Sequence, residues 1–171
     1  MSKRDLKKYL GTLSKAQLET QIVELYDKFS NVKTFYDFAF NPNEDKLLRE
    51  AKVKISNEYF PTANKRAKMR RSVAQKFIKH FITIGVDPYI TADVMLYTIE
   101  IALAYSSEKT IKQASFYSSM LSSFSQVIRF CIENGMVADF KNRIISVNEK
   151  VQAQQWLNRY DFTTVMEKGL Y

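Results

Sequence analysis

The sequence predicts an all-α fold, and three observations carry that prediction. Apolar residues recur at spacings of three and four, as on one face of an α-helix, and not at the alternating spacing of a strand. The chain of 171 residues has only 4 glycines and 3 prolines, so few residues interrupt a helix. The pairs Asn41-Pro42 and Asp87-Pro88 are typical helix starts. We therefore expect six to seven helices, arranged as a multi-helix bundle or as stacked antiparallel αα-hairpins.

Short helices are expected in the first forty residues. Residues 3–10 predict a basic helix that ends at Gly11. Ser14 and Gln17 have the spacing of a capping box, in which the serine oxygen accepts a backbone N–H of the first turn. Residues 32–40 are rich in aromatic side chains and are expected to form a short helix. The helix after Ser14 has one apolar face, which consists of Leu18, Ile22, Leu25, Tyr26 and Phe29.

The next helix is expected to run from Pro42 to about Phe60. Asn41 is a favourable N-cap, Pro42 suits the first helical position, and Glu44 completes a capping box. Pro61 should end the helix, because the residue before a proline disfavours the helical conformation. The face expected to be buried consists of Leu48, Ala51, Ile55 and Tyr59.

Four long helices are expected to form the core. Gly85 ends the first of them, and Asp87 with Pro88 starts the second after so short a connection that the two should lie antiparallel. The second is apolar on most sides, which predicts a central buried helix. Gly135 should end the third. The four predicted helices cover residues 72–85, 88–106, 114–134 and 137–158.

Three segments outside these helices are less regular. Residues 62–71 fit either a basic loop or a first turn or two of helix capped by Asn64. Residues 107–110 are a predicted loop, and residues 159–171 are a possible aromatic tail. The length fits one domain of ordinary size, so we expect a single helical domain over residues 1–171.

Positive charge is concentrated in one segment. The formal net charge is +8, and residues 61–85 hold seven cations and no acid. Arginines beside a helix start make a plausible anion pocket, and nucleic acid is the obvious carrier of many phosphates. A solvated loop, or an arm that docks on an acidic face of the protein, is the alternative. Arg70 and Arg71 are expected to be exposed, and the candidate anion or nucleic-acid site comprises Lys65, Arg66, Lys68, Arg70, Arg71, Ser72, Lys76 and Lys79.

A second candidate site lies on the central helix. Asp93, Tyr97 and Glu100 fall on one helical face, so two carboxyls flank a phenol. This is the only arrangement in the sequence that suits acid–base chemistry. The alternative, which we favour, is a polar stripe that faces water or forms ion pairs with Lys or Arg of a neighbouring helix.

Other polar residues predict structural roles. His80 is the only histidine and is expected on the surface, and Cys131 is expected to be a buried, inert thiol. No cluster has metal-ligand spacing, so we expect neither a metal nor a cofactor. The third core helix is unusually rich in serine, which favours close helix packing within the domain or between subunits. These serines are Ser115, Ser118, Ser119, Ser122, Ser123 and Ser125.

Three functional hypotheses follow, in order of preference. The first is a non-enzymatic binding module that engages a polyanion, nucleic acid above all, through residues 65–71. The second is a protein-interaction or oligomerisation scaffold that uses the aromatic segment 35–40 or the serine-rich helix. The third is an enzyme that uses Asp93 and Glu100. The sequence has no signal-peptide pattern and no apolar run long enough to span a bilayer, so we expect a cytoplasmic protein without a membrane partner.

Six short stretches carry a family resemblance: residues 5–10, 24–29, 40–42, 71–76, 85–89 and 92–97. Together they resemble an uncharacterised bacterial domain-of-unknown-function family of short, all-helical proteins. The resemblance covers most of the chain up to about residue 145. It implies a bacterial cytosolic helical protein. It implies no activity, because that family has no assigned catalytic or binding residues to carry over.

Overall fold

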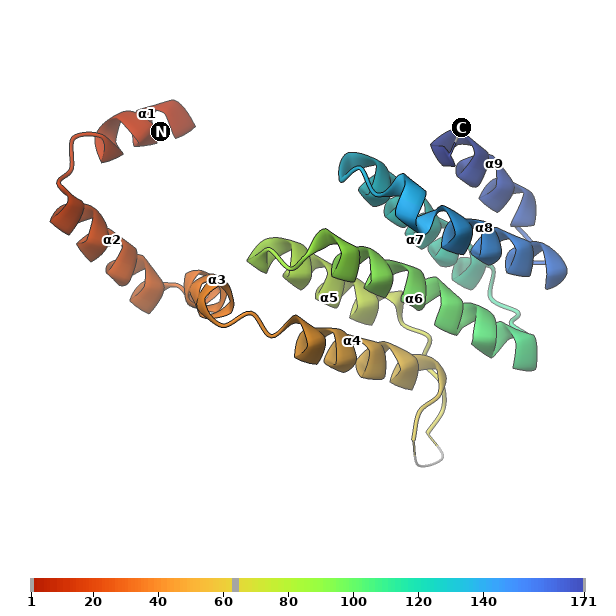
Figure 1. The fold of residues 1–171 in the computed structure, drawn as a ribbon. Helices are drawn as coiled ribbons and strands as arrows, with labels where there is room; N and C mark the ends of the chain where they lie inside the picture. Colours follow the sequence, from red (N-terminus) through yellow and green to blue (C-terminus); the bar gives the residue numbers. More distant parts are fainter. Residues whose placement is uncertain (1, 63–64, 171) are drawn as a thin grey trace. The chain divides into compact units, whose positions relative to one another are not determined.

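The computed structural model describes residues 2–62 and 65–170, and all the regular secondary structure in this part of the chain is helical, without a strand. The all-α prediction is therefore confirmed. The predicted number of six to seven helices is wrong, because the described residues form nine (Figure 1). Contacts group the chain into two compact units, Met1–Pro42 and Asn43–Tyr171. The single domain over residues 1–171 stays a prediction.

The first unit consists of three short helices, α1 (Lys3–Leu10), α2 (Lys15–Lys28) and α3 (Ser30–Phe40). The predicted capping box is confirmed. The Gln17 N–H donates to Ser14 Oγ at 3.3 Å, and the Ser14 N–H donates to Gln17 Oε1 at 2.8 Å. No residue of these three helices is buried. The apolar face of α2 therefore has no core of its own to cover it.

Helix α4 (Glu44–Tyr59) starts two residues later than the sequence predicts. Asn43 is its N-cap, and the Asn43 side chain accepts the Lys46 N–H at 3.2 Å. The predicted cap, Asn41, instead closes α3 by donating its N–H to the Asp37 carbonyl at 3.1 Å. Two asparagines flank Pro42, and α3 has already engaged the first one. The helix ends before Pro61, as predicted.

The second unit is a stack of three helical hairpins. The hairpins pair α4 with α5 (Arg71–Ile84), α6 (Pro88–Glu108) with α7 (Ala114–Glu133), and α8 (Val137–Ala153) with α9 (Arg159–Leu170). The first helices of the hairpins pack on one another in the order α4, α6, α8 (Figure 1). Helix α6 packs against α4, α5, α7 and α8 and contributes more buried residues than any other helix, which confirms the predicted central helix.

The turn between α5 and α6 has the predicted chemistry. Gly85 ends α5 with φ of 81°, in the left-handed region that glycine adopts without steric cost. Asp87 caps α6, since its Oδ1 accepts the Tyr89 N–H at 2.7 Å, and Pro88 is the first helical residue. Gly135 follows α7 with φ of 70°, also as predicted.

The predicted boundaries near the C-terminus need two corrections. Helix α6 continues to Glu108 and takes up the first half of the predicted loop 107–110. Helix α8 ends at Ala153 instead of residue 158, because Gln155 has φ of 54° and the chain turns to bury Trp156. The possible tail, residues 159–171, forms α9 over its described part. There the fully buried Phe162 packs on Phe124 with ring centroids 5.0 Å apart.

Candidate anion-binding site

The basic segment, defined here as residues 65–71, has no regular secondary structure from residue 65 to residue 70. The proposed cap Asn64 lies outside the described residues. Backbone bonds fix the course of the second half of the segment: the N–H groups of Lys68 and Met69 both donate to the Glu58 carbonyl, at 2.9 and 3.0 Å. Met69 has φ of 50°, a left-handed conformation that is costly for a residue with a side chain. Residues 68 and 69 are therefore held against the end of α4.

Arg70 is joined to the buried acid of α4. Its Nε donates to Glu58 Oε2 at 2.9 Å, its Nη2 donates to Oε1 at 2.7 Å, and its backbone N–H donates to Oε2 at 3.3 Å. The side-chain hydrogen bond from Arg70 is the main reason that the pKa of Glu58 lies below its ordinary value. The side chain of Arg70 is 53% exposed, but its charge is balanced by Glu58.

Arg71, the first residue of α5, reaches across to α7. Its Nε donates to Ser123 Oγ at 2.7 Å and its Nη2 donates to Gln126 Oε1 at 3.2 Å. The side chain is partly buried, and this burial lowers the pKa of the guanidinium. The expected exposure is therefore wrong for Arg71. Both of its partners are neutral, and within the described ranges it has no ion pair with a carboxylate.

The segment lines three hollows in the surface, and the two that matter here adjoin each other. The larger has a volume of about 660 Å³, and its lining consists of residues 65–70 together with Gln113, which precedes α7. The second hollow, called the Arg71 hollow, has a volume of about 390 Å³. The two share Lys68, Met69 and Gln113. The Arg71 hollow is lined by Lys68, Met69, Arg71, Gln113, Ser115, Phe116 and Ser119.

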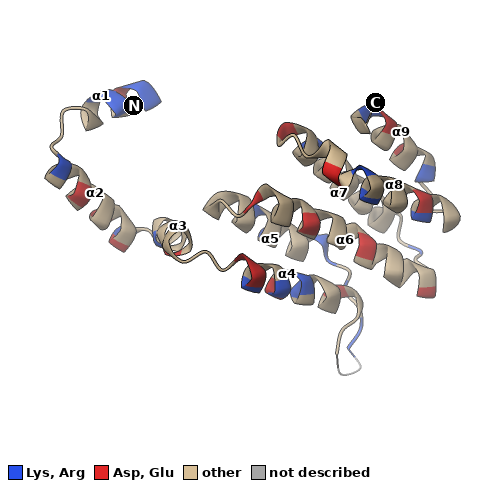
Figure 2. Ribbon diagram, in the orientation of Figure 1, with Lys and Arg blue, Asp and Glu red and all other residues tan. Residues whose placement is uncertain are grey.

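Three cations of the segment form no ion pair among the described residues. Lys65, Arg66 and Lys68 are exposed and take part in no ion pair there. Figure 2 shows these blue positions on the chain between α4 and α5, with no acidic residue among them. The structure thus divides the predicted cluster into two arginines that hold the fold and three cations that face solvent.

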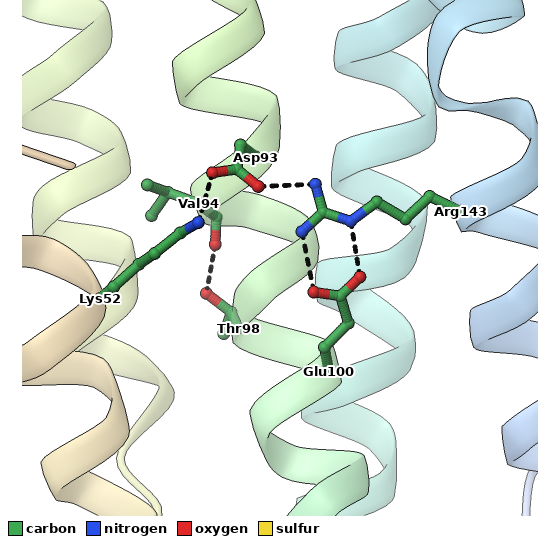
Figure 3. A network of polar contacts seen from close by, with 6 residues as sticks. All are labelled: Lys52, Asp93, Val94, Thr98, Glu100 and Arg143. Atoms are coloured by element: carbon green, nitrogen blue, oxygen red, sulfur yellow. Dashed lines mark hydrogen bonds and ion pairs between the residues drawn. The ribbon is translucent and has the colours of Figure 1, made fainter. Parts of the chain in front are cut away.

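The second predicted site is an ion-pair network that joins three helices (Figure 3). Arg143 of α8 donates to both oxygens of Glu100, at 2.6 and 2.8 Å, and to Asp93 Oδ1 at 2.6 Å. Lys52 of α4 lies 2.6 Å from Asp93 Oδ2 and 5.2 Å from the ring centre of Tyr97. Burial raises the pKa of Asp93, but the hydrogen bonds from Lys52 and Arg143 outweigh it, so the pKa lies below its ordinary value.

This arrangement favours the structural interpretation of Asp93, Tyr97 and Glu100. A general acid or base needs a pKa near the working pH and a free path to its substrate. Both oxygens of each carboxylate are engaged by cations, and the pKa of Asp93 is shifted away from neutrality. The network fastens α4 and α8 to the central helix.

The comparison with protein families decides the classification of the chain. A model described as a family of unknown function, DUF6155, matches residues 1–169. The chain belongs to this family. The resemblance to an uncharacterised family is therefore confirmed, and the expected bacterial origin stays a prediction. No curated protein and no solved structure matches the chain.

The remaining residues of the predicted anion site lie along α5. Ser72, Lys76 and Lys79 are exposed and follow one another at helical spacing, but none of them lines either hollow. Ser72 does not cap the helix, because Arg70 is the N-cap and no side chain bonds the first turn. The structure does not bring these three residues together with the two hollows.

The serine-rich helix α7 uses its hydroxyls mostly within the helix. Ser118, Ser119 and Ser122 donate to carbonyls three or four residues earlier. Ser123 is buried and accepts the hydrogen bond from Arg71, which links α5 to α7, and the predicted close helix packing stays a prediction. The sequence gives no signal that Ser123, Gln126 and Gln113 belong to the surroundings of the basic segment, because a contact between hairpins has no local pattern.

Three further findings concern the thiol, metal sites and membrane-spanning helices. Cys131 is fully buried, and burial raises the pKa of its thiol to about 11. Across residues 2–62 and 65–170, no group of three or more His, Cys, Asp or Glu side chains is placed to hold a metal ion. No described helix combines the length and the apolar character needed to cross a membrane.

Proposed function

We propose that this protein is a non-enzymatic binding module that holds a polyanion, with nucleic acid as the favoured class, on the basic segment. One observation carries the proposal: an open hollow of about 660 Å³ is lined by Lys65, Arg66 and Lys68, none of which forms an ion pair in the described chain. Cations that neutralise phosphates release condensed counter-ions, and this release drives binding without regard to sequence.

Contact with the phosphate backbone is the mode that this surface supports. Phosphate contacts position a protein on nucleic acid, while base contacts specify a sequence. Exposed Lys and Arg side chains on a loop suit the first task, and no base-reading motif accompanies them. Because Glu58 already neutralises Arg70, the three outer cations and Arg71 are the charges available to a ligand.

The test compares two triple variants on mixed-sequence DNA and RNA at low salt. Replacing Lys65, Arg66 and Lys68 by Gln should reduce the slope of log affinity against log salt by about 2 to 3, since each phosphate contributes roughly 0.7 to 0.9. The control variant carries Gln at three exposed lysines elsewhere, and its net charge changes equally. These positions are Lys109, Lys150 and Lys168. Undetectable binding by the wild type, or equal slopes for both variants, contradicts the proposal.

A second candidate function, self-association, has its own observation. None of the residues in α1 to α3 is buried, and eight large apolar side chains there are 43% to 77% exposed. Apolar groups gathered on a small unit commonly mark an interaction surface. They are Leu6, Tyr9, Ile22, Val23, Leu25, Phe29, Phe35 and Phe40.

The charges on α2 favour a second copy of the chain as the partner. A groove of about 240 Å³ is lined by Leu25 and Phe29, with Gln21, Glu24 and Lys28 at the same site. In a two-fold dimer each contact occurs twice with the roles exchanged. An antiparallel pair of α2 helices would place Glu24 of each copy opposite Lys28 of the other.

The oligomeric state tests this second candidate. The wild type should sediment as a concentration-dependent dimer, and Leu25→Glu should sediment as a monomer at the same concentrations. Val53→Glu, at an exposed apolar position on α4, is the matched control and should leave the dimer intact. A wild-type mass equal to one chain at every concentration excludes self-association.

A further inference from the structure

The lining of the Arg71 hollow suits the binding of a single anionic group. Its lining includes two cations, Lys68 and Arg71, and no acid. The polar residues that complete it, Gln113, Ser115 and Ser119, are neutral and offer hydrogen bonds. The Arg71 hollow thus combines cations with neutral hydrogen-bonding residues, whereas the larger hollow is lined mainly by the exposed cations of the segment.

Arg71 is the strongest reason to assign a ligand to this hollow. Buried or partly buried charges in proteins are ordinarily paired with an opposite charge, because their removal from water is costly. Arg71 is partly buried and bonded only to the neutral side chains of Ser123 and Gln126 in the described chain. Those two bonds orient the planar guanidinium and leave its charge uncompensated.

Backbone N–H groups, which carry partial positive charge, are also available to an anion at this position. Helix α7 starts at this hollow without a side-chain cap, and its N-cap is Gln113. The Phe116 N–H donates to the Gln113 carbonyl at 3.1 Å, while no hydrogen bond of the Ala114 or Ser115 N–H occurs within the described chain. Helices α3, α5 and α8 also start without a side-chain cap, whereas α1, α2, α4 and α6 have one. Free first-turn N–H groups favour an anion.

We propose that the Arg71 hollow binds one phosphate group, with Arg71 and Lys68 supplying the charge and Ser115 and Ser119 supplying hydrogen bonds. A guanidinium held by two bonds presents a fixed fork that matches the geometry of phosphate oxygens. Only the identity of the molecule that carries the phosphate group rests on the proposed polyanion function. That carrier is the terminal phosphate of a nucleic-acid strand or a free phosphate.

A negative charge introduced into the hollow tests the proposal without removing a structural contact. Ser115 is exposed and is the second residue of α7, so Ser115→Asp places a carboxylate in the hollow and at a favourable helix position. Ser118→Asp is the matched control, because Ser118 lies on the same helix, is exposed and does not line the hollow. Thermal unfolding should show Ser115→Asp to be at least as stable as the wild type.

Calorimetry on the full chain then uses two kinds of probe. Inorganic phosphate is the first, and the second is a single-stranded oligonucleotide with either a 5′-phosphate or a 5′-hydroxyl. Ser115→Asp should weaken phosphate binding about tenfold, in line with a like charge a few ångströms away in a partly screened site. Ser118→Asp should bind as the wild type does. A preference for the 5′-phosphate identifies a strand end as the carrier, and equal affinities identify a free phosphate.

Two results overturn the proposal: no binding of phosphate by the wild type together with no preference for the 5′-phosphate, or equal losses in the two Asp variants. The double variant Lys65→Gln/Arg66→Gln separates this proposal from the polyanion function, because neither residue lines the Arg71 hollow. It should lose salt-dependent binding of the 5′-hydroxyl strand and keep its affinity for phosphate. Failure of the polyanion function therefore leaves the phosphate result intact.

Discussion

Replacing Asp93 by Asn tests whether the ion-pair network is structural. The change keeps the size of the side chain and removes its charge. In the wild type, Asp93 Oδ2 lies 2.6 Å from Lys52 Nζ and Asp93 Oδ1 lies 2.6 Å from an Arg143 nitrogen. The variant leaves Lys52 without an ion-pair partner among the described residues, while Arg143 keeps both bonds to Glu100.

The expected decrease in the free energy of unfolding lies between the values measured for exposed ion pairs and for buried ion pairs. Exposed pairs contribute about 0 to 1 kcal/mol, and removing one partner of a buried pair costs roughly 3 to 5 kcal/mol. The side chain of Asp93 is 23% exposed, and those of Lys52 and Arg143 are each 33% exposed. We therefore expect Asp93→Asn to lower the free energy of unfolding by about 1 to 3 kcal/mol at pH 7.

The pH dependence of this loss has a definite sign. Burial raises the pKa of Asp93, but the hydrogen bonds from Lys52 and Arg143 bring it below its ordinary value. A group whose pKa is depressed in the folded state contributes stability above its unfolded pKa, which is about 4 for Asp. The contribution is lost as the pH falls through the folded pKa. The difference between wild type and variant should be constant at neutral pH and shrink below about pH 4.

Urea unfolding of the wild type, Asp93→Asn and Glu149→Gln provides the measurement. Glu149 is an exposed acid on α8 outside the network, so its variant should unfold like the wild type. If Asp93 were instead a strained catalytic carboxylate, its neutralisation would leave stability unchanged or raise it. A variant that is as stable as the wild type, or more stable, would refute the structural interpretation.

The remaining predictions concern the cap, the last hairpin and the thiol. Asp87→Ala should lower the unfolding free energy by about 0.5 to 2 kcal/mol in urea, because Asp87 caps the first turn of α6. Phe162→Ala should lower it by about 3 to 5 kcal/mol, since Phe162 is fully buried against Phe124; a smaller change would show that α9 is not part of the core. Cys131, fully buried with a raised pKa, should resist iodoacetamide at pH 8 until urea unfolds the chain.

The helices could be predicted wherever local signals agreed. Gly85, Asp87 and Pro88 give an unambiguous stop and start, and the structure follows them. At residues 41–43 either of two asparagines could be the N-cap of α4, and which of them caps it depends on where α3 ends. The turn after α8 depends on burying Trp156 among aromatic rings that come from other helices. The free energy gained by burying Trp156 comes from tertiary contacts, and the local sequence pattern does not predict such contacts.

The candidate sites were predictable as clusters of residues but not as arrangements of charge. The stripe of Asp93, Tyr97 and Glu100 is visible in the sequence, while its cations lie on other helices, at Lys52 and Arg143. Contacts of this kind join residues more than forty positions apart. Sequence spacing within one helix therefore indicates which groups share a face, but it does not indicate what neutralises them.

The two adjacent arginines show why the charge of a segment overstates what it offers a ligand. Arg70 turns back to Glu58 at the end of α4, and Arg71 crosses to Ser123 on α7. These opposite anchors, with the backbone bonds to the Glu58 carbonyl, give residues 68–71 a fixed course. A loop that is already ordered loses little conformational entropy when it binds. The two arginines thus hold the part of the segment that carries Lys68, so this cation is positioned before a ligand binds.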